Sequence, residues 1–347
     1  MAPVVIESFA PHYEEKWDAY LTTHSNALFY STCRFRRFLA RLLGCDDCSL
    51  LSFRDGTPTG VLPLMAMGER DQRVYNSLPF FGTSAGILAD DAQSYRRLVE
   101  AYNDLAMASG TAAATIIGSQ FGEWPEATAL VHTHLDSRVA QLTRLPTTSE
   151  PRSEILRTIE GSARRNVKKA EAAGVVVETD AGAVETLGAL HEARMHDIGG
   201  RTKPSAFFRL LPGSFAATRD YEIYIARLSG RPVAALLLFY FNGIAEYYMP
   251  AVDPDASDLQ PLALVLVEAM TDACRRGIRW WNWGGTWHAQ TGVYRFKRKW
   301  GADERTYYYR TQLNESRLLT WTAGELEDAF PYFFVVPFSA LTTGQTA

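Results

Sequence analysis

Two stretches of the chain follow the same order of turn and apolar positions. Residues 54–67 (RDGTPTGVLPLMAM) and 228–241 (LSGRPVAALLLFYF) each begin with a short turn that contains Gly and Pro, and each continues into an apolar run. A turn of this composition is typical of a β-hairpin that leads into a buried strand. The pattern therefore predicts two related units.

The likeness continues beyond the hairpins. In each copy we expect a second aromatic strand, an Asp-rich loop, a helix and a third strand: 73–81, 88–91, about 93–109 and 111–118 in the first copy, and 244–249, 253–255, about 260–276 and 278–284 in the second. Gly110 and Gly277 follow the two helices and fit left-handed C-caps. Two mixed α/β domains follow from this order, unless two generic α/β segments resemble each other by chance.

A helix or helix pair is predicted between the copies, over residues 153–174. In its second half lie the basic residues Arg164, Arg165, Lys168 and Lys169. The like charges at i and i+4 repel each other. Two interpretations stay open: a solvated face beside Glu160 and Glu171, or a surface that meets an anionic ligand or nucleic acid.

Composition places the chain among folded globular proteins. It has 347 residues, of which 47% are hydrophobic and 12% aromatic, with a mean hydropathy of -0.14. Disorder, collagen and coiled coil are excluded, and the length suits two domains. The longest apolar run, Val233–Phe241, is about half of the ~20 residues that span a bilayer. An acidic N-terminus argues against an export signal, so we expect a cytoplasmic protein.

Charge and metal-binding residues exclude further classes. The net charge of -4 argues against a generally basic nucleic-acid coat, although Lys and Arg gather between residues 295 and 310. Cys45 and Cys48 have CxxC spacing without a second pair, and we interpret them as buried or incidental. His191 and His196 lie five residues apart, which does not suit two ligands on one helix face. No metal site is predicted.

Familiar catalytic motifs are missing from the sequence. It contains no GxGxxG after a strand, no GxxxxGK[ST], no HExxH and no GxSxG. Dinucleotide-binding, P-loop, zincin and α/β-hydrolase functions are therefore poor interpretations.

The most distinctive stretch runs from residue 279 to residue 310. A Trp-rich strand is expected to end at Gly284-Gly285, and the segment 292–301 then presents Tyr294, Phe296, Lys297 and Trp300. The aromatic residues suit packing. A lysine held beside apolar rings is suited to stabilising an oxyanion or binding a phosphate.

These residues carry a family resemblance. The segments that carry it are RRNVKKAEAAGV (164–175), SGRPVAA (229–235), Gly284-Gly285 followed by GVYRFK (292–297), and NSLPF (76–80) with Gly86. From about residue 30 to 310, their order resembles the FemABX family of tandem GNAT-fold transferases. The resemblance implies an α/β fold with mixed sheets and two GNAT-like domains, with the active site in or near a cleft between them.

We place these domains at residues 1–150 and 151–315. The apolar tail, residues 316–347, is expected to pack on a domain, namely the second, or at a dimer interface. The chain resembles the compact members of the family, which have no helical hairpin.

The resemblance also implies an activity, the transfer of an aminoacyl group from aminoacyl-tRNA to an amine of a small acceptor. That acceptor would be a cell-envelope precursor or a secondary metabolite, and no tightly bound cofactor is implied. An acyl-CoA-dependent N-acyltransferase of polysaccharide or secondary-metabolite biosynthesis is the alternative. A non-catalytic protein that binds a glycan or peptide through its aromatic residues is a second alternative.

The expected site residues fall into three groups, of which the first two follow the family resemblance and the third follows the basic clusters of the sequence. Phe296 and Lys297 match the pair at the donor's acyl end. Arg201, Phe208, Tyr248, Tyr294 and, more loosely, Arg36 or its neighbour Arg37 match substrate-binding positions. Donor or tRNA contacts are expected at Arg164, Arg165, Lys168, Lys169 and Arg298.

The loop 253–261 bears on the donor. Acetyl-CoA enzymes of the GNAT fold carry a Gly-rich loop there, whose N–H groups hold the pyrophosphate. This chain has no glycine in the loop and three carboxylates, Asp253, Asp255 and Asp258. We expect them to repel a pyrophosphate, which favours aminoacyl-tRNA over CoA.

Overall fold

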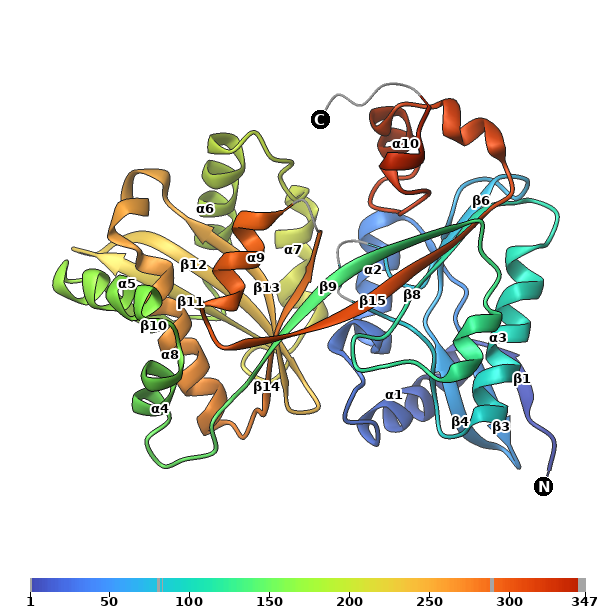
Figure 1. The fold of residues 1–347 in the computed structure, drawn as a ribbon, viewed down its shortest axis with the longest axis horizontal. Coiled ribbons are helices and arrows are strands. Elements are labelled where there is room, and N and C mark those ends of the chain that lie inside the picture. The colour runs from blue at the N-terminus through green and yellow to red at the C-terminus, as the bar shows by residue number, and fades with distance from the viewer. Residues whose placement is uncertain (1, 80–81, 83, 288–289, 343–347) are drawn as a thin grey trace. The chain divides into compact units, whose positions relative to one another are not determined.

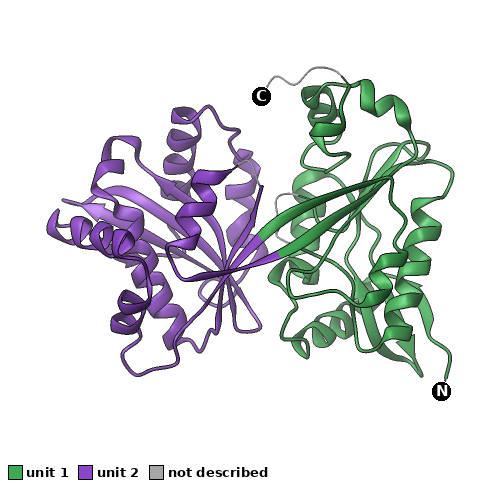
Figure 2. Ribbon diagram, viewed as in Figure 1, with its two compact units in different colours: residues 1–139, 306–347 green, residues 140–305 purple. Residues whose placement is uncertain are grey.

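The computed structural model describes residues 2–79, 82, 84–287 and 290–342 (Figure 1). The chain divides into two compact units, which Figure 2 colours separately. Unit 1 comprises residues 1–139 and 306–347, and unit 2 comprises residues 140–305. Within the described ranges, no helix is both long enough and apolar enough to cross a bilayer.

Unit 1 contains two groups of strands. One is a four-stranded sheet in the order β1-β3-β4-β7, and the other has the order β15-β8-β6-β5-β2. The bounds are β1 Val5–Ser8, α1 Glu14–Thr22, α2 Cys33–Leu43, β2 Asp46–Asp47, β3 Leu50–Arg54, β4 Thr57–Leu62, β5 Met65–Met67, β6 Arg73–Asn76, β7 Leu88–Ala89, α3 Ala92–Ala106, β8 Thr111–Ile117, β9 His134–Arg144, β15 Ala302–Leu313 and α10 Ala323–Ala329. Short 3-10 helices lie at Pro11–Tyr13, Phe29–Ser31, Pro125–Ala129, Ser316–Thr320 and Phe338–Ala340.

Unit 2 holds a sheet in the order β10-β11-β12-β13-β14-β9. Strands β10 to β13 pair antiparallel, and β13 pairs parallel with β14. The bounds are α4 Pro151–Thr158, α5 Gly161–Ala172, β10 Val176–Thr179, α6 Val184–Asp197, α7 Ser205–Ser214, β11 Tyr221–Leu228, β12 Arg231–Phe241, β13 Ile244–Val252, the 3-10 helix η4 Pro254–Leu259, α8 Pro261–Arg275, β14 Trp280–Thr286 and α9 Thr291–Arg298.

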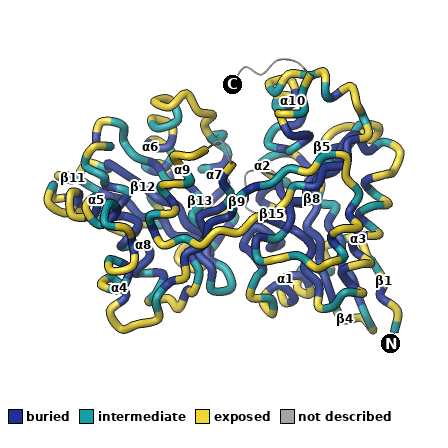
Figure 3. The backbone as a smooth tube through the Cα atoms, in the orientation of Figure 1, coloured by how far each residue is buried: buried dark blue, intermediate teal, exposed yellow. Residues whose placement is uncertain are grey.

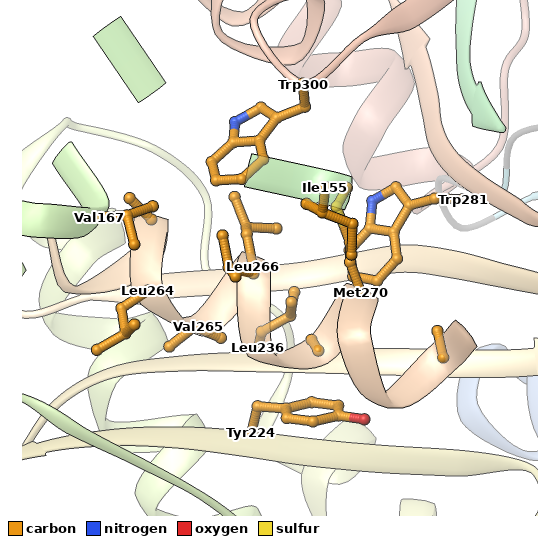
Figure 4. Close-up of a cluster of buried hydrophobic side chains, with 14 of the residues drawn as sticks. Ile155, Val167, Tyr224, Leu236, Leu264, Val265, Leu266, Met270, Trp281 and Trp300 are labelled. Atoms are coloured by element: carbon orange, nitrogen blue, oxygen red, sulfur yellow. The ribbon is translucent and has the colours of Figure 1, made fainter. Parts of the chain in front are cut away.

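The core of unit 2 lies between this sheet and helices α4, α5 and α8. Figure 4 shows Leu266 and Met270 of α8 beside Trp281 of β14 and Leu236 of β12. Such burial stabilises a unit by about 25 cal/mol for each Å² of apolar surface removed from water. The central strands are accordingly buried along most of their length (Figure 3).

Helices α6 and α7 cover the opposite face. Leu238 of β12 belongs to the core beneath α8, and its neighbour Phe239 packs edge-on against Phe215, the residue that follows α7. Successive side chains of a strand point to opposite faces, so the sheet of unit 2 is covered on both sides.

The repeated pattern predicted from the sequence is confirmed. Both hairpins turn through two residues with positive φ, Asp55-Gly56 (51° and 76°) and Ser229-Gly230 (49° and 82°). The expected helices are α3 and α8, and the glycines behind them, Gly110 and Gly277, have φ of 91° and 75°.

Several elements differ in extent from the prediction. Residues 153–174 form a helix pair, α4 and α5. The strand expected over 73–81 ends at Asn76, while residues 80 and 81 lie outside the described residues. Strand β14 does not end at Gly284-Gly285 but continues to Thr286.

The unit boundaries also differ from the predicted 1–150 and 151–315. Two long strands, β9 and β15, each contribute residues to both units, so the division falls inside strands rather than in a linker. The C-terminal segment packs within unit 1. There the Asn76 side chain donates to the Phe334 carbonyl (2.8 Å) and accepts from its N–H (2.6 Å), because a side-chain amide can pair with a peptide group as a strand does.

Candidate active site

A cavity of about 490 Å³ lies within unit 2. Its wall is mostly apolar, and it is built from α5, α6, β13, the start of α8 and α9. The lining residues are Ala163, Asn166, Arg194, Met195, Ile198, Tyr247, Pro250, Val252, Ser257, Gln260, Pro261, Leu262, Ala263, Gly292, Val293, Phe296, Lys297, Lys299 and Trp300. A concave apolar site with a few polar groups is the usual form of a small-molecule site.

The cavity opens where two strands separate. The parallel pairing of β13 with β14 covers three residue pairs and ends at Glu246 and Asn282. Strand β13 continues to Val252, and its second half lines the cavity. A register shift between Leu237 and Leu238 of β12 falls opposite residues 247–249 of β13. Tyr247 lines the cavity, and Tyr248 stacks on Phe207 of α7.

Lys297 is the buried cation of this cavity. It lies near the end of α9 with only 5% of its surface exposed. Its Nζ donates to the Thr286 hydroxyl (2.8 Å) and to the Gly285 carbonyl (3.2 Å). Burial disfavours the charged form and lowers the pKa of Lys297 to about 8. The ammonium therefore titrates close to neutral pH.

Two buried polar residues of β9 hold the ends of α9. Gln141 donates to the Tyr294 carbonyl (3.2 Å). Thr143 donates to the Trp300 carbonyl (3.0 Å), and its hydroxyl accepts from the Trp283 indole (2.9 Å). The helix that carries Lys297 is thus tied to the sheet on both sides of the lysine.

Phe296 lies beside Lys297 and lines the cavity. Its ring meets Trp283 edge-on, with centroids 6.2 Å apart and an interplanar angle of 88°. This geometry is favourable for aromatic pairs and fixes the ring. The Phe296-Lys297 pair expected from the sequence therefore presents one apolar and one cationic group to the same cavity.

The lining carries positive but no negative charge among the residues that the structure describes. Its cations are Arg194, Lys297 and Lys299, and Arg194 is paired with Asp197 (2.6 Å). Asn166 donates to the side chain of Gln260 (2.8 Å) at one wall.

The Asp-rich loop does not place its carboxylates in the cavity. Asp253 pairs with Arg231 and also accepts from the backbone N–H of Asp255 (3.1 Å), while Asp255 is largely exposed. Only Ser257 and Gln260 of residues 253–260 reach the lining. Arg231 pairs with Asp253, and none of the three carboxylates of the loop belongs to the lining.

On the α7 side of β13, a second group of residues surrounds Tyr248. Its ring stacks on Phe207 with centroids 5.9 Å apart. Lys203 Nζ lies 5.2 Å from the centroid of the Tyr248 ring, and burial lowers the pKa of Lys203 to about 7. His191 accepts from the Lys203 backbone N–H (3.1 Å) and packs against Phe208. Burial, with a smaller effect of Lys203, lowers the pKa of His191 to about 4.

This group contains two of the expected substrate-binding residues, Tyr248 and Phe208. Arg201 lies in the exposed segment just before α7. Lys203 was not predicted from the sequence as a site residue, although it lies two residues after Arg201 and four before Phe207.

The expected donor-binding residues divide into two kinds. Arg164 donates to the Ile159 carbonyl (2.5 Å) at the end of α4, so its charge caps that helix. Arg165, Lys168 and Lys169 are exposed on α5, and Arg298 is exposed at the end of α9. These four remain accessible to an anionic partner.

Tyr294 and Arg36 do not face the cavity. The Tyr294 hydroxyl donates to Glu304, and the residue is not part of the lining. Arg36 belongs to unit 1, where it is 1% exposed, donates to Asp47 (2.6 Å) and lies 3.9 Å from the centroid of Trp17. Its guanidinium holds the interior of unit 1 together, which is incompatible with binding an acceptor's phosphates as expected. The neighbouring Arg37 is exposed and pairs with Glu14.

Among the described residues, no three His, Cys, Asp or Glu side chains are grouped to hold a metal ion. Cys45 is buried, Cys48 is half-buried, and both are free thiols.

Fold and site together define a protein with two GNAT-like units in tandem. Residues 159–298 match the family model described as an acetyltransferase (GNAT) domain, which supports an acyltransferase. No curated protein matches the chain.

Among solved structures, the fold is that of the FemABX type. The crystal structure of FemX has a TM-score of 0.72 at 14% identity and covers 90% of this chain and 98% of its own. The C-terminal domain of a putative lysylphosphatidylglycerol synthetase from Agrobacterium fabrum has a TM-score of 0.56 at 12% identity, with 94% and 98% covered. A tandem GNAT protein from the clavulanic acid biosynthesis pathway, solved without AcCoA, has a TM-score of 0.52 at 11% identity, with 89% and 98% covered. At these identities the likeness concerns the fold.

Proposed function

We propose that unit 2 transfers an acyl group from an activated ester or thioester to an amine, with Lys297 stabilising the oxyanion of the tetrahedral intermediate. One observation carries the proposal, the buried ammonium of Lys297 in the wall of a mostly apolar cavity. Two of its N–H groups are occupied by Thr286 and Gly285. The third meets no acceptor among the described residues and is the donor offered to the substrate.

The reaction needs little other chemistry from the protein. A neutral amine attacks the donor carbonyl, a C–N bond forms, and the C–O or C–S bond breaks. The amine loses a proton, and the leaving alkoxide or thiolate takes one up. Orientation and a preorganised oxyanion donor are the main contributions of a site of this kind. A nucleophilic side chain is not required.

For the donor, we propose an aminoacyl group carried by aminoacyl-tRNA. The resemblance to the FemABX family supports it, and so do three exposed cations, Arg165, Lys168 and Lys169, on a helix that lines the cavity. Basic side chains of this kind bind the phosphates of a nucleic acid. The acceptor would be an amine on a cell-envelope precursor or a secondary metabolite.

A second candidate donor is acyl-CoA. The placing of the loop carboxylates favours it, because Asp253 is neutralised by Arg231 and Asp255 is turned to solvent. AcCoA is also the ligand named in connection with the clavulanic acid pathway protein, which shares the tandem fold. The two donors differ only in what carries the activated acyl group into the cavity.

The test supplies both donors separately, with cell extract as the source of amines. Radiolabelled aminoacyl-tRNAs and acyl-CoAs are incubated with the protein, and loss of the acyl group to small products is measured with and without ribonuclease. Ribonuclease-sensitive transfer identifies the tRNA donor, and ribonuclease-resistant transfer from CoA identifies the alternative. If neither donor is consumed, the acyltransferase proposal is wrong, and a glycan- or peptide-binding function becomes the better interpretation.

A further inference from the structure

We propose that Glu246 and Asn282 are positioning residues for Lys297. They form a buried pair at the last paired position of β13 and β14, just before the residues of β14 that hold the lysine. Their contacts link the pair to Lys297, and the importance of the pair for turnover rests on the proposed function.

The pair is a polar contact inside the sheet. Glu246 is 1% exposed and Asn282 is 0% exposed. The two residues face each other in the last register pair of β13 and β14, and the Asn282 amide donates to Glu246 Oε2 at 2.7 Å. A buried carboxylate costs free energy unless it is hydrogen-bonded, so a contact of this kind is retained where it serves a purpose.

The other end of the Asn282 amide contacts the backbone of β14 two residues further on. Its Oδ1 accepts from the backbone N–H of Gly284 at 3.0 Å. Gly284 has a φ of 75°, a conformation that glycine adopts without strain. Because pairing with β13 has ended, this N–H is satisfied by a side chain of its own strand, and β14 bends away at Gly284.

The two residues after the bend are the ones that hold Lys297. Gly285 supplies its carbonyl oxygen and Thr286 its hydroxyl, at 3.2 and 2.8 Å from Nζ. Hydrogen bonds thus join Glu246 to Asn282 and Asn282 to Gly284, and the backbone then joins Gly284 to the two residues that hold the lysine. The orientation of the Asn282 amide is fixed by Glu246, and it sets where both acceptors lie.

Position matters strongly for an oxyanion donor. A displacement of about 1 Å at a reacting group costs on the order of 10²-fold in rate. The Glu246–Asn282 pair is buried in the sheet and is not part of the cavity lining, so it acts on Lys297 and not on the substrate.

The test exchanges donor and acceptor within the pair. Asn282→Asp still accepts from Gly284 but sets two carboxylates against each other. Adding Glu246→Gln restores one hydrogen bond, now donated by the glutamine. We expect N282D to lower kcat by about 10²-fold with KM for the acceptor nearly unchanged. The exchanged pair, E246Q/N282D, is expected to return kcat to within a few-fold of wild type.

A second readout follows Lys297 directly and needs no turnover. Competitive labelling with acetic anhydride over a pH series, followed by mass spectrometry, gives the apparent pKa of this one amine. We expect about 8 in the wild type, a rise toward the ordinary lysine value in N282D, and a return in the exchanged pair. Asn282→Ser, which buries no new charge, should shift the pKa in the same direction and serves if N282D does not fold.

Asn314 of unit 1 offers a matched control. Its amide donates to the carbonyls of Ala106 (2.7 Å) and Thr111 (2.9 Å). Asn314→Ala therefore also removes hydrogen bonds of a side-chain amide, but in unit 1 and not in the unit that holds Lys297. That variant should lower the melting temperature without moving the Lys297 pKa. The inference is overturned if N282D and Asn282→Ser, both folded, keep the wild-type pKa, or if E246Q/N282D fails to restore it. If the pKa responds as expected but removal of Lys297 leaves turnover intact, the proposed function fails while the positioning role stands.

Discussion

Replacing Lys297 by methionine tests the central claim with little change in volume. The methionine keeps an apolar stem in the cavity wall and removes the ammonium that donates to Thr286 and Gly285. Loss of one preorganised oxyanion donor lowers kcat by about 10²- to 10³-fold. We expect this loss in kcat with a small change in KM, since the lost interaction forms fully only in the transition state.

The pH profile carries a second part of the same prediction. With a pKa of about 8, about nine tenths of Lys297 is protonated at pH 7, and the charged fraction falls as the pH rises through 8. Turnover should therefore fall on the alkaline side in the wild type. In Lys297→Arg, whose guanidinium stays charged, that alkaline loss should disappear even where the rate is lower.

The assay is steady-state acyl transfer with whichever donor proves active, over pH 6 to about 10, with thermal melts to confirm folding. Lys16→Met, a substitution of an exposed lysine of unit 1, controls for the loss of one positive charge. A Lys297→Met enzyme within threefold of the wild-type kcat would refute the role given to this side chain.

Three further predictions follow from the charges of unit 2. Folding lowers the pKa of Lys297 from 10.5 to about 8, so the unfolded chain binds the proton more tightly than the folded one. The free energy of unfolding of the wild type, relative to that of Lys297→Met, should therefore rise by up to about 3 kcal/mol as the pH rises from about 8 to 10.5. Urea melts at pH 7 and pH 10 measure this difference, and an equal difference at both pH values would contradict the prediction. The double variant Lys168→Glu/Lys169→Glu should weaken aminoacyl-tRNA binding at least about tenfold at low salt and reduce its dependence on salt, while transfer from a small thioester stays unchanged. Filter binding across a salt series measures this, and an unaltered slope of affinity against salt concentration argues against a tRNA surface on α5. The described lining has cations and no carboxylate, so the acyl-CoA alternative predicts that a neutral acyl group is transferred at least about tenfold faster than one of equal length with a charged amine, whereas the aminoacyl donor predicts no such preference. Butyryl and 4-aminobutyryl donors provide the comparison, and equal rates would show that the cavity charge does not select against an amine on the acyl group.

Much of the fold follows from local sequence. The turns at Asp55-Gly56 and Ser229-Gly230 need residues that tolerate positive φ, and Gly277 follows the C-cap of α8 for the same reason. Such signals depend on a few neighbouring residues, so they can be recognised in a single sequence. The order of these elements was distinctive enough to indicate the tandem GNAT fold, and the FemX comparison confirms it.

The strand ends and unit boundaries were harder to predict because they depend on pairing partners. Nothing near Asn76 shows that its side chain will pair with Phe334, more than 250 residues later. In the same way, the residues of β9 and β15 fall into both units because distant strands pair with them. Such partners are decided by tertiary structure.

The candidate site divides along the same line. The sequence by itself drew attention to Lys297, because a lysine between Phe296 and Arg298 is not an ordinary core residue, and the family resemblance added Phe296. Only the tertiary structure decided which charges form ion pairs within the protein. Arg36 pairs with Asp47, and Asp253 pairs with Arg231. It also decided that Glu246 and Asn282, 36 positions apart, are hydrogen-bonded inside the sheet. The residue type alone determines which chemical groups a side chain carries. Strand register and packing between residues distant in the chain determine its partner, and therefore its pKa and whether it is free to contact a substrate.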